Sequence, residues 1–119
     1  MRNAIIAAAA IAAIAAAGSA QAHARLITGS PKAGTTVAAP KVLTLHYSES
    51  IVPAASSVKL AAASGAPVAT GPLSLDAKDK RLVTVPVPGP LAPGPYRVMW
   101  HMKTEDGHET DGQFVFTVK

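Results

Sequence analysis

The sequence contains no cysteine, which excludes disulfide bridges and any metal site built on thiolates. Aromatic residues make up only 4% of the chain, and the lysines occur mostly singly rather than in a basic stripe. Single-stranded nucleic acids are bound by basic grooves interleaved with exposed aromatic side chains, so we expect no nucleic-acid partner. Past the N-terminal segment, no window has the 3.6-residue periodicity of an amphipathic helix. A disulfide-linked domain, a nucleic-acid-binding module and a helical bundle are therefore all disfavoured.

Residues 1–22 are predicted to be a cleavable secretory signal peptide. Arg2 supplies the positive start, residues 4–17 form an apolar run of alanine and isoleucine, and Ala20-Gln21-Ala22 has the small residues of a cleavage site. The apolar run is shorter than the roughly 20 residues that a membrane-spanning helix needs. Cleavage leaves 97 of the 119 residues, which is enough for a single exported domain over 23–119.

The mature chain is predicted to be all-β. Proline and glycine recur at short intervals between runs rich in valine, leucine and threonine, which is typical of strands joined by turns. Side chains two residues apart share a face of a strand, so the alternating apolar residues mark the core. We expect seven strands, at about residues 25–28, 42–49, 57–62, 67–75, 81–86, 94–103 and 112–119. The core is expected to contain Leu43, Leu45, Tyr47, Tyr96, Val98, Trp100, Met102, Phe114, Phe116 and Val118.

Cleavage after Ala22 would make His23 the first residue of the mature protein. A histidine at that position carries two nitrogen donors, the free α-amine and the imidazole, which together can chelate one metal ion. Because some residue must come first, His23 alone would be weak evidence for a metal site.

A second group of candidate ligands lies in Asp106-Gly107-His108, between the last two predicted strands. In a locally extended segment Asp106 and His108 would point the same way and present one carboxylate oxygen and one imidazole nitrogen. If the seven strands alternate in direction, the start of the first strand, the connection after the second and this loop share one end of the domain. Glu49 begins that second connection, and we expect it to be either a hydrogen-bond acceptor for a ligating imidazole or an occasional ligand, ranked below His23, Asp106 and His108.

Three nitrogens and one carboxylate oxygen suit tetragonal copper(II), which also stands highest in the affinity order of divalent metals, with zinc as the main competitor. The absence of cysteine excludes a blue-copper electron-transfer site. We therefore expect one copper(II) ion per chain, held for binding rather than for electron transfer.

Several segments together carry a resemblance to a known family. They are His23-Ala24-Arg25-Leu26, Ser30-Pro31 with Gly34, residues 43–49, residues 94–98 with Trp100, Asp106-Gly107-His108 and residues 112–116. In order and spacing they resemble the CopC family of periplasmic copper-binding proteins. The resemblance implies a seven-stranded Greek-key β-barrel or sandwich of immunoglobulin-like and cupredoxin-like topology, a periplasmic location, and a role in copper resistance or delivery. It also implies copper(II) ligands at His23, Asp106 and His108. The protein is expected to be a monomer whose partner is an inner-membrane copper transporter of CopD type or another periplasmic copper protein.

Some members of that family also hold copper(I) in a methionine-rich loop. The corresponding residues 59–75 contain no methionine, and Met99 and Met102 are expected on opposite faces of one strand, so no copper(I) site is expected. His46 and His101 both lie within strands, where we expect a structural role for His46 and a solvated side chain for His101.

Two alternative functions stay open at this point. One is a copper-dependent oxidative enzyme, because an N-terminal histidine chelate resembles the copper centre of lytic polysaccharide monooxygenases. The other is a metal-free interaction module of immunoglobulin type, in which His23 is incidental.

Overall fold

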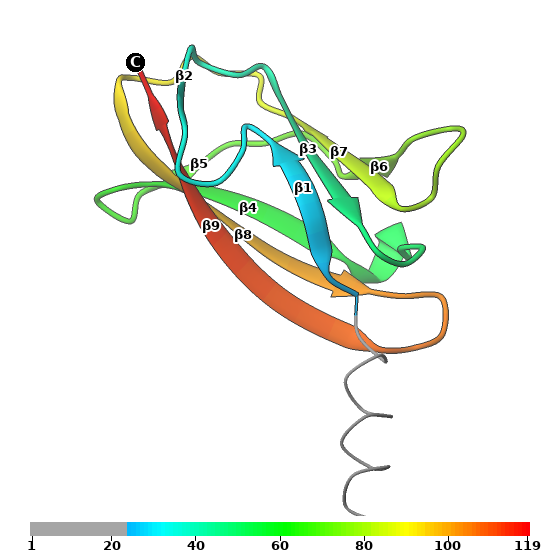
Figure 1. Ribbon diagram of the computed structural model, residues 1–119. Coiled ribbons are helices and arrows are strands. Elements are labelled where there is room, and N and C mark those ends of the chain that lie inside the picture. The colour runs from blue at the N-terminus through cyan, green and yellow to red at the C-terminus, as the bar shows by residue number, and fades with distance from the viewer. Residues whose placement is uncertain (1–23) are drawn as a thin grey trace, which may run out of the picture.

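The computed structural model describes residues 24–119, which form two β-sheets packed against each other (Figure 1). The first sheet contains, in spatial order, β1 (Leu26–Ser30), β3 (Val42–Tyr47), β7 (Leu82–Pro86) and β6 (Ser74–Leu75). The second contains β2 (Thr36–Val37), β9 (Glu109–Val118), β8 (Gly94–Lys103), β4 (Ser57–Ala62) and β5 (Pro67–Val68). A short 3-10 helix, η1 (Pro53–Ala55), joins β3 to β4.

The all-β prediction is confirmed, but the described residues form nine strands rather than seven. The single strand predicted over residues 67–75 is wrong, because β5 and β6 are two-residue strands in different sheets. Between them Gly71 donates its backbone N–H to the carbonyl of Pro86 at 2.8 Å, and Pro72 has no backbone N–H to donate. The chain therefore leaves one sheet and joins the other here. The parallel strand β2 was missed, since two residues carry no alternating pattern.

The core lies between the two sheets and matches the predicted faces. Leu43, Leu45 and Tyr47 point inward from β3, and each is at most 1% exposed. Trp100 on β8 meets Tyr47 from the opposite sheet in an edge-to-face arrangement, with ring centroids 5.2 Å apart. The other predicted core residues Tyr96, Val98, Met102, Phe116 and Val118 are also buried, while Phe114 is half-buried against them.

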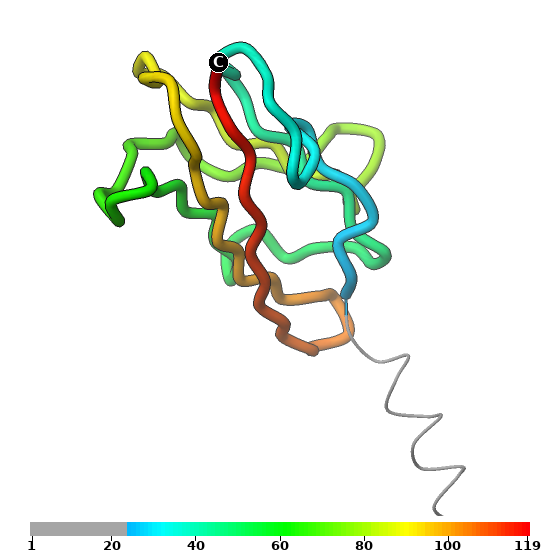
Figure 2. Tube along the Cα trace, turned by 60° about the vertical axis from the view of Figure 1, so that its left-hand side comes forward, coloured from blue at the N-terminus to red at the C-terminus, as the bar shows by residue number. Residues whose placement is uncertain are grey.

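Strands β8 and β9 form the longest element, an antiparallel hairpin of ten residues on each side. Its register runs from Gly94 opposite Val118 to Lys103 opposite Glu109, which leaves a five-residue loop, residues 104–108. The loop lies beside the start of β1 in both views of the chain (Figures 1 and 2).

Candidate metal centre

The hairpin loop is closed by a tight turn rather than by an extended segment. The N–H of Gly107 donates to the carbonyl of Thr104 at 2.9 Å, and the N–H of Thr104 donates to the carbonyl of His108 at 2.9 Å. Gly107 has a φ of 90°, in the region that glycine adopts without steric cost. The prediction that residues 106–108 are locally extended is therefore wrong, because the turn needs a backbone conformation that is not extended.

The turn nevertheless brings the two predicted ligand side chains together. Oδ1 of Asp106 lies 3.2 Å from Nδ1 of His108 and also accepts a hydrogen bond from the His108 N–H at 3.4 Å. The side chains of Asp106 and His108 are 54% and 44% exposed, so a small cation can reach both. The loop thus presents a carboxylate and an imidazole side by side at the surface.

The Asp106 carboxylate is held in its ionised form. The Thr104 hydroxyl donates a hydrogen bond to Oδ1 of Asp106. This bond first, and the His108 imidazole second, lower the pKa of Asp106 below its ordinary value. The carboxylate is therefore anionic at neutral pH, as a metal ligand must be.

The connection after β3 meets both the loop and the start of β1, as the sequence predicted. Ser48 donates its N–H to the carbonyl of Arg25 at 2.9 Å, and its hydroxyl oxygen accepts the Arg25 N–H at 2.9 Å. Two residues later the carbonyl of Ser50 accepts the N–H of Glu105 at 3.1 Å. Glu49 lies between these two contacts and is exposed. His23 lies outside the described residues, but Arg25, two positions after it, is at this same end of the domain.

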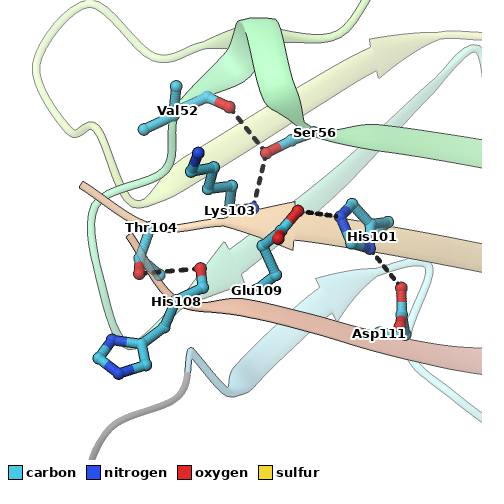
Figure 3. Close-up of polar contacts among 8 residues, drawn as sticks. All are labelled: Val52, Ser56, His101, Lys103, Thr104, His108, Glu109 and Asp111. Atoms are coloured by element: carbon cyan, nitrogen blue, oxygen red, sulfur yellow. Dashed lines mark hydrogen bonds and ion pairs between the residues drawn. The ribbon is translucent and has the colours of Figure 1, made fainter. Parts of the chain in front are cut away.

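His101 belongs to a separate cluster on the same hairpin (Figure 3). Its Nδ1 lies 2.5 Å from Oδ1 of Asp111, and its Nε2 lies 3.0 Å from Oε1 of Glu109. These two carboxylates, Asp111 more than Glu109, raise the pKa of His101. The imidazole of His108 points away from this cluster in Figure 3, so the structure does not bring His101 to the Asp106–His108 pair.

The His101 side chain is 38% exposed, in line with the expected solvated side chain, but its pairing with two carboxylates was not predicted. The signal that would have found the cluster is the hairpin register, which places Asp111 directly opposite His101 and Glu109 two residues away. His46 has the structural role expected for it, with Nε2 3.0 Å from Oδ2 of Asp79 in the connection before β7.

Among residues 24–119, no group of three or more histidine, aspartate or glutamate side chains has an arrangement that would hold a metal ion. Within the same part of the chain, no helix has the length and apolar character needed to cross a membrane.

The two-sheet fold agrees with the family to which the chain belongs. It is a member of the CopC family, whose domain model, described as "CopC domain", matches residues 26–119.

Individual relatives show the same relationship. The chain is 36% identical over 99 residues to Protein YobA of Escherichia coli strain K12, covering 82% of this chain and 80% of YobA. It is 31% identical over 105 residues to Copper resistance protein C of Pseudomonas syringae pv. tomato, covering 84% and 83% of the two chains. The crystal structure of CopC from Methylosinus trichosporium OB3b superposes with a TM-score of 0.76 at 34% identity, covering 82% of this chain and 94% of that one.

Proposed function

We propose that this protein is a periplasmic copper-binding protein that holds one copper(II) ion through His23, Asp106 and His108. The observation that carries the proposal is the Asp106–His108 pair, 3.2 Å apart, in a loop beside the start of β1. A cleavable signal peptide over residues 1–22 would leave the α-amine and imidazole of His23 as the remaining nitrogen donors. The relatives named copper resistance proteins support copper as the cargo.

The chemistry of the donor set fits copper(II). Asp106 contributes one anionic oxygen and His108 one imidazole nitrogen, while an N-terminal histidine adds an amine and a second imidazole. Three nitrogens and one oxygen match the tetragonal coordination that copper(II) prefers. Zinc prefers tetrahedral coordination instead. Glu49, whose neighbours Ser48 and Ser50 contact Arg25 and Glu105, would accept a hydrogen bond from a ligating imidazole.

The proposed role is carriage of copper rather than catalysis. The Asp106 carboxylate would fill a coordination position on the copper ion that an oxidative enzyme needs open for oxygen. We propose that the protein serves copper resistance, buffering or delivery as a monomer, and passes copper to an inner-membrane transporter of CopD type or to another periplasmic copper protein.

The test is a copper(II) titration of tag-free protein that begins at His23, with electron paramagnetic resonance of the loaded form. We expect one tightly bound equivalent with a nitrogen-rich tetragonal spectrum. One extra residue before His23, or the substitution His108→Ala, should weaken binding by at least about 100-fold, since each removes a direct ligand and even the loss of an outer partner costs 10–100-fold.

The matched control is His101→Gln, which removes another histidine of the same hairpin and should leave the affinity for copper(II) unchanged. Equal and weak binding by the mature protein and the extended variant would refute the N-terminal site. Loss of binding in His101→Gln together with retained binding in His108→Ala would show that His101, and not His108, is the copper ligand.

A further inference from the structure

We propose that Thr104 is a positioning residue of the copper site, whose hydroxyl anchors Oδ1 of Asp106 and so turns Oδ2 toward the metal. This inference rests on the proposed function, since it assigns a role within the same site. Thr104 ends the β8 side of the hairpin and forms an isolated bridge with Ile51 of the connection after β3.

The burial of Thr104 is unusual for a polar side chain at a surface loop. It is 2% exposed, and within residues 24–119 it is the one buried polar residue apart from the tyrosines. Ile51, its bridge partner, is 1% exposed. A buried hydroxyl needs a hydrogen-bond partner from the protein, because an unsatisfied one costs about 1–3 kcal/mol. The Thr104 hydroxyl therefore has a strong preference for acceptors in its own loop.

Two acceptors lie within reach of that hydroxyl. It donates to Oδ1 of Asp106 and lies 3.2 Å from the backbone carbonyl oxygen of His108. A hydroxyl has one proton to donate, so it can serve only one of these two acceptors fully. A bond from a neutral donor to a carboxylate is stronger than one to a neutral carbonyl, so the proton belongs on the Asp106 side.

The hydrogen bonds of Asp106 all converge on one of its two oxygens. Oδ1 receives the Thr104 hydroxyl, the N–H of His108 at 3.4 Å and the contact with Nδ1 of His108 at 3.2 Å. Within the described part of the chain, no hydrogen bond ends on Oδ2. The structure thus divides the carboxylate into an anchored oxygen and an oxygen presented to a ligand, which suits a carboxylate that binds a metal through one atom.

The backbone of Thr104 is fixed independently of its hydroxyl. Its N–H donates to the His108 carbonyl and its own carbonyl accepts from Gly107, each at 2.9 Å. Removal of the hydroxyl alone should therefore leave the turn in place and release only the Asp106 carboxylate. This separation makes the proposal testable by substitution.

The experiment compares copper(II) affinity and the paramagnetic resonance spectrum in Thr104→Val, Thr104→Ala and Thr104→Ser, all in the mature protein that begins at His23. We expect valine and alanine to weaken binding by about 10–100-fold, the usual effect of losing a partner that orients a ligand, and to change the spectrum. Thr104→Ser keeps the hydroxyl and should therefore keep both the affinity and the spectrum of the wild-type protein. Thr84→Val is the control, because its hydroxyl pairs with Ser74 at 2.9 Å in the opposite sheet and should not affect copper.

A double-mutant cycle separates positioning from a general loss of structure. In an Asp106→Ala background the hydroxyl has no carboxylate to orient, so Thr104→Val should have no further effect on the affinity. Wild-type affinity and spectrum in both Thr104→Val and Thr104→Ala would overturn the inference while the proposed function stands. An equal loss in the presence and absence of the Asp106 carboxylate would also overturn it. Failure of the proposed function would show earlier, as weak binding by the wild-type protein that is insensitive to the N-terminal extension.

Discussion

The close contact between Gly112 and Trp100 predicts a large effect of adding a single methyl group. A Cβ atom at position 112 would lie 2.9 Å from Cη2 of the indole, 2.5 Å from Cε2 and closer still to Cζ2. Carbon atoms in favourable contact are about 3.5–4.0 Å apart, so in Gly112→Ala the ring must retreat by about 1 Å or more. Trp100 cannot retreat freely, because its indole packs against Tyr47 of the opposite sheet.

The expected loss of stability follows from these two contacts. Overpacking of this kind costs about 1–3 kcal/mol, and disturbing an aromatic pair costs about 0.5–1.5 kcal/mol. We expect Gly112→Ala to lower the free energy of unfolding by about 2 kcal/mol, which corresponds to a fall in Tm of about 8–16 °C for a domain of this size. Thermal unfolding of the metal-free protein, followed by circular dichroism, measures this.

The control is Gly89→Ala, at a position where an added Cβ would meet no atom within 4 Å. There the substitution should be neutral or stabilising by up to about 1 kcal/mol, because alanine restricts the unfolded chain more than glycine does. Trp100 is the single tryptophan, so its emission spectrum reports directly on the displaced ring. Equal Tm values for the two variants, with unchanged emission from Gly112→Ala, would refute the reasoning.

Two further predictions concern the core and the hairpin. The hydroxyl of Tyr47 is buried with no hydrogen-bond partner among the described residues, and burial raises the pKa of its phenol, so Tyr47→Phe should be neutral or stabilising by about 1 kcal/mol in thermal unfolding. Tyr96→Phe, which removes a hydroxyl that donates to a backbone carbonyl at 2.7 Å, should instead destabilise by about 1 kcal/mol, and the opposite order would contradict the assignment. Because Asp111 and Glu109 raise the pKa of His101, the protonated imidazole contributes stability that is fully present below about pH 6.5 and is lost as the pH rises through the raised pKa. In metal-free protein the difference in Tm between wild type and His101→Gln should therefore shrink as the pH rises above 6.5, and a constant difference would contradict this.

The sequence by itself determined the all-β class and the faces of the main strands. Alternation with a period of two is a local property, so Leu43, Leu45 and Tyr47 could be placed on the buried face without knowing what they pack against. The closeness of Asp106 and His108 is also a local property, because the two residues flank Gly107 in a short turn.

Only the tertiary structure decided how those strands pair and which polar groups meet. The division of residues 67–75 between two sheets depends on contacts with β4 and β7, which no local pattern encodes. The burial of Thr104 likewise depends on its bridge to Ile51, fifty-three positions earlier in the chain. Hydrogen-bond partners are set by register between distant segments, and register is a property of the folded chain rather than of any stretch of sequence.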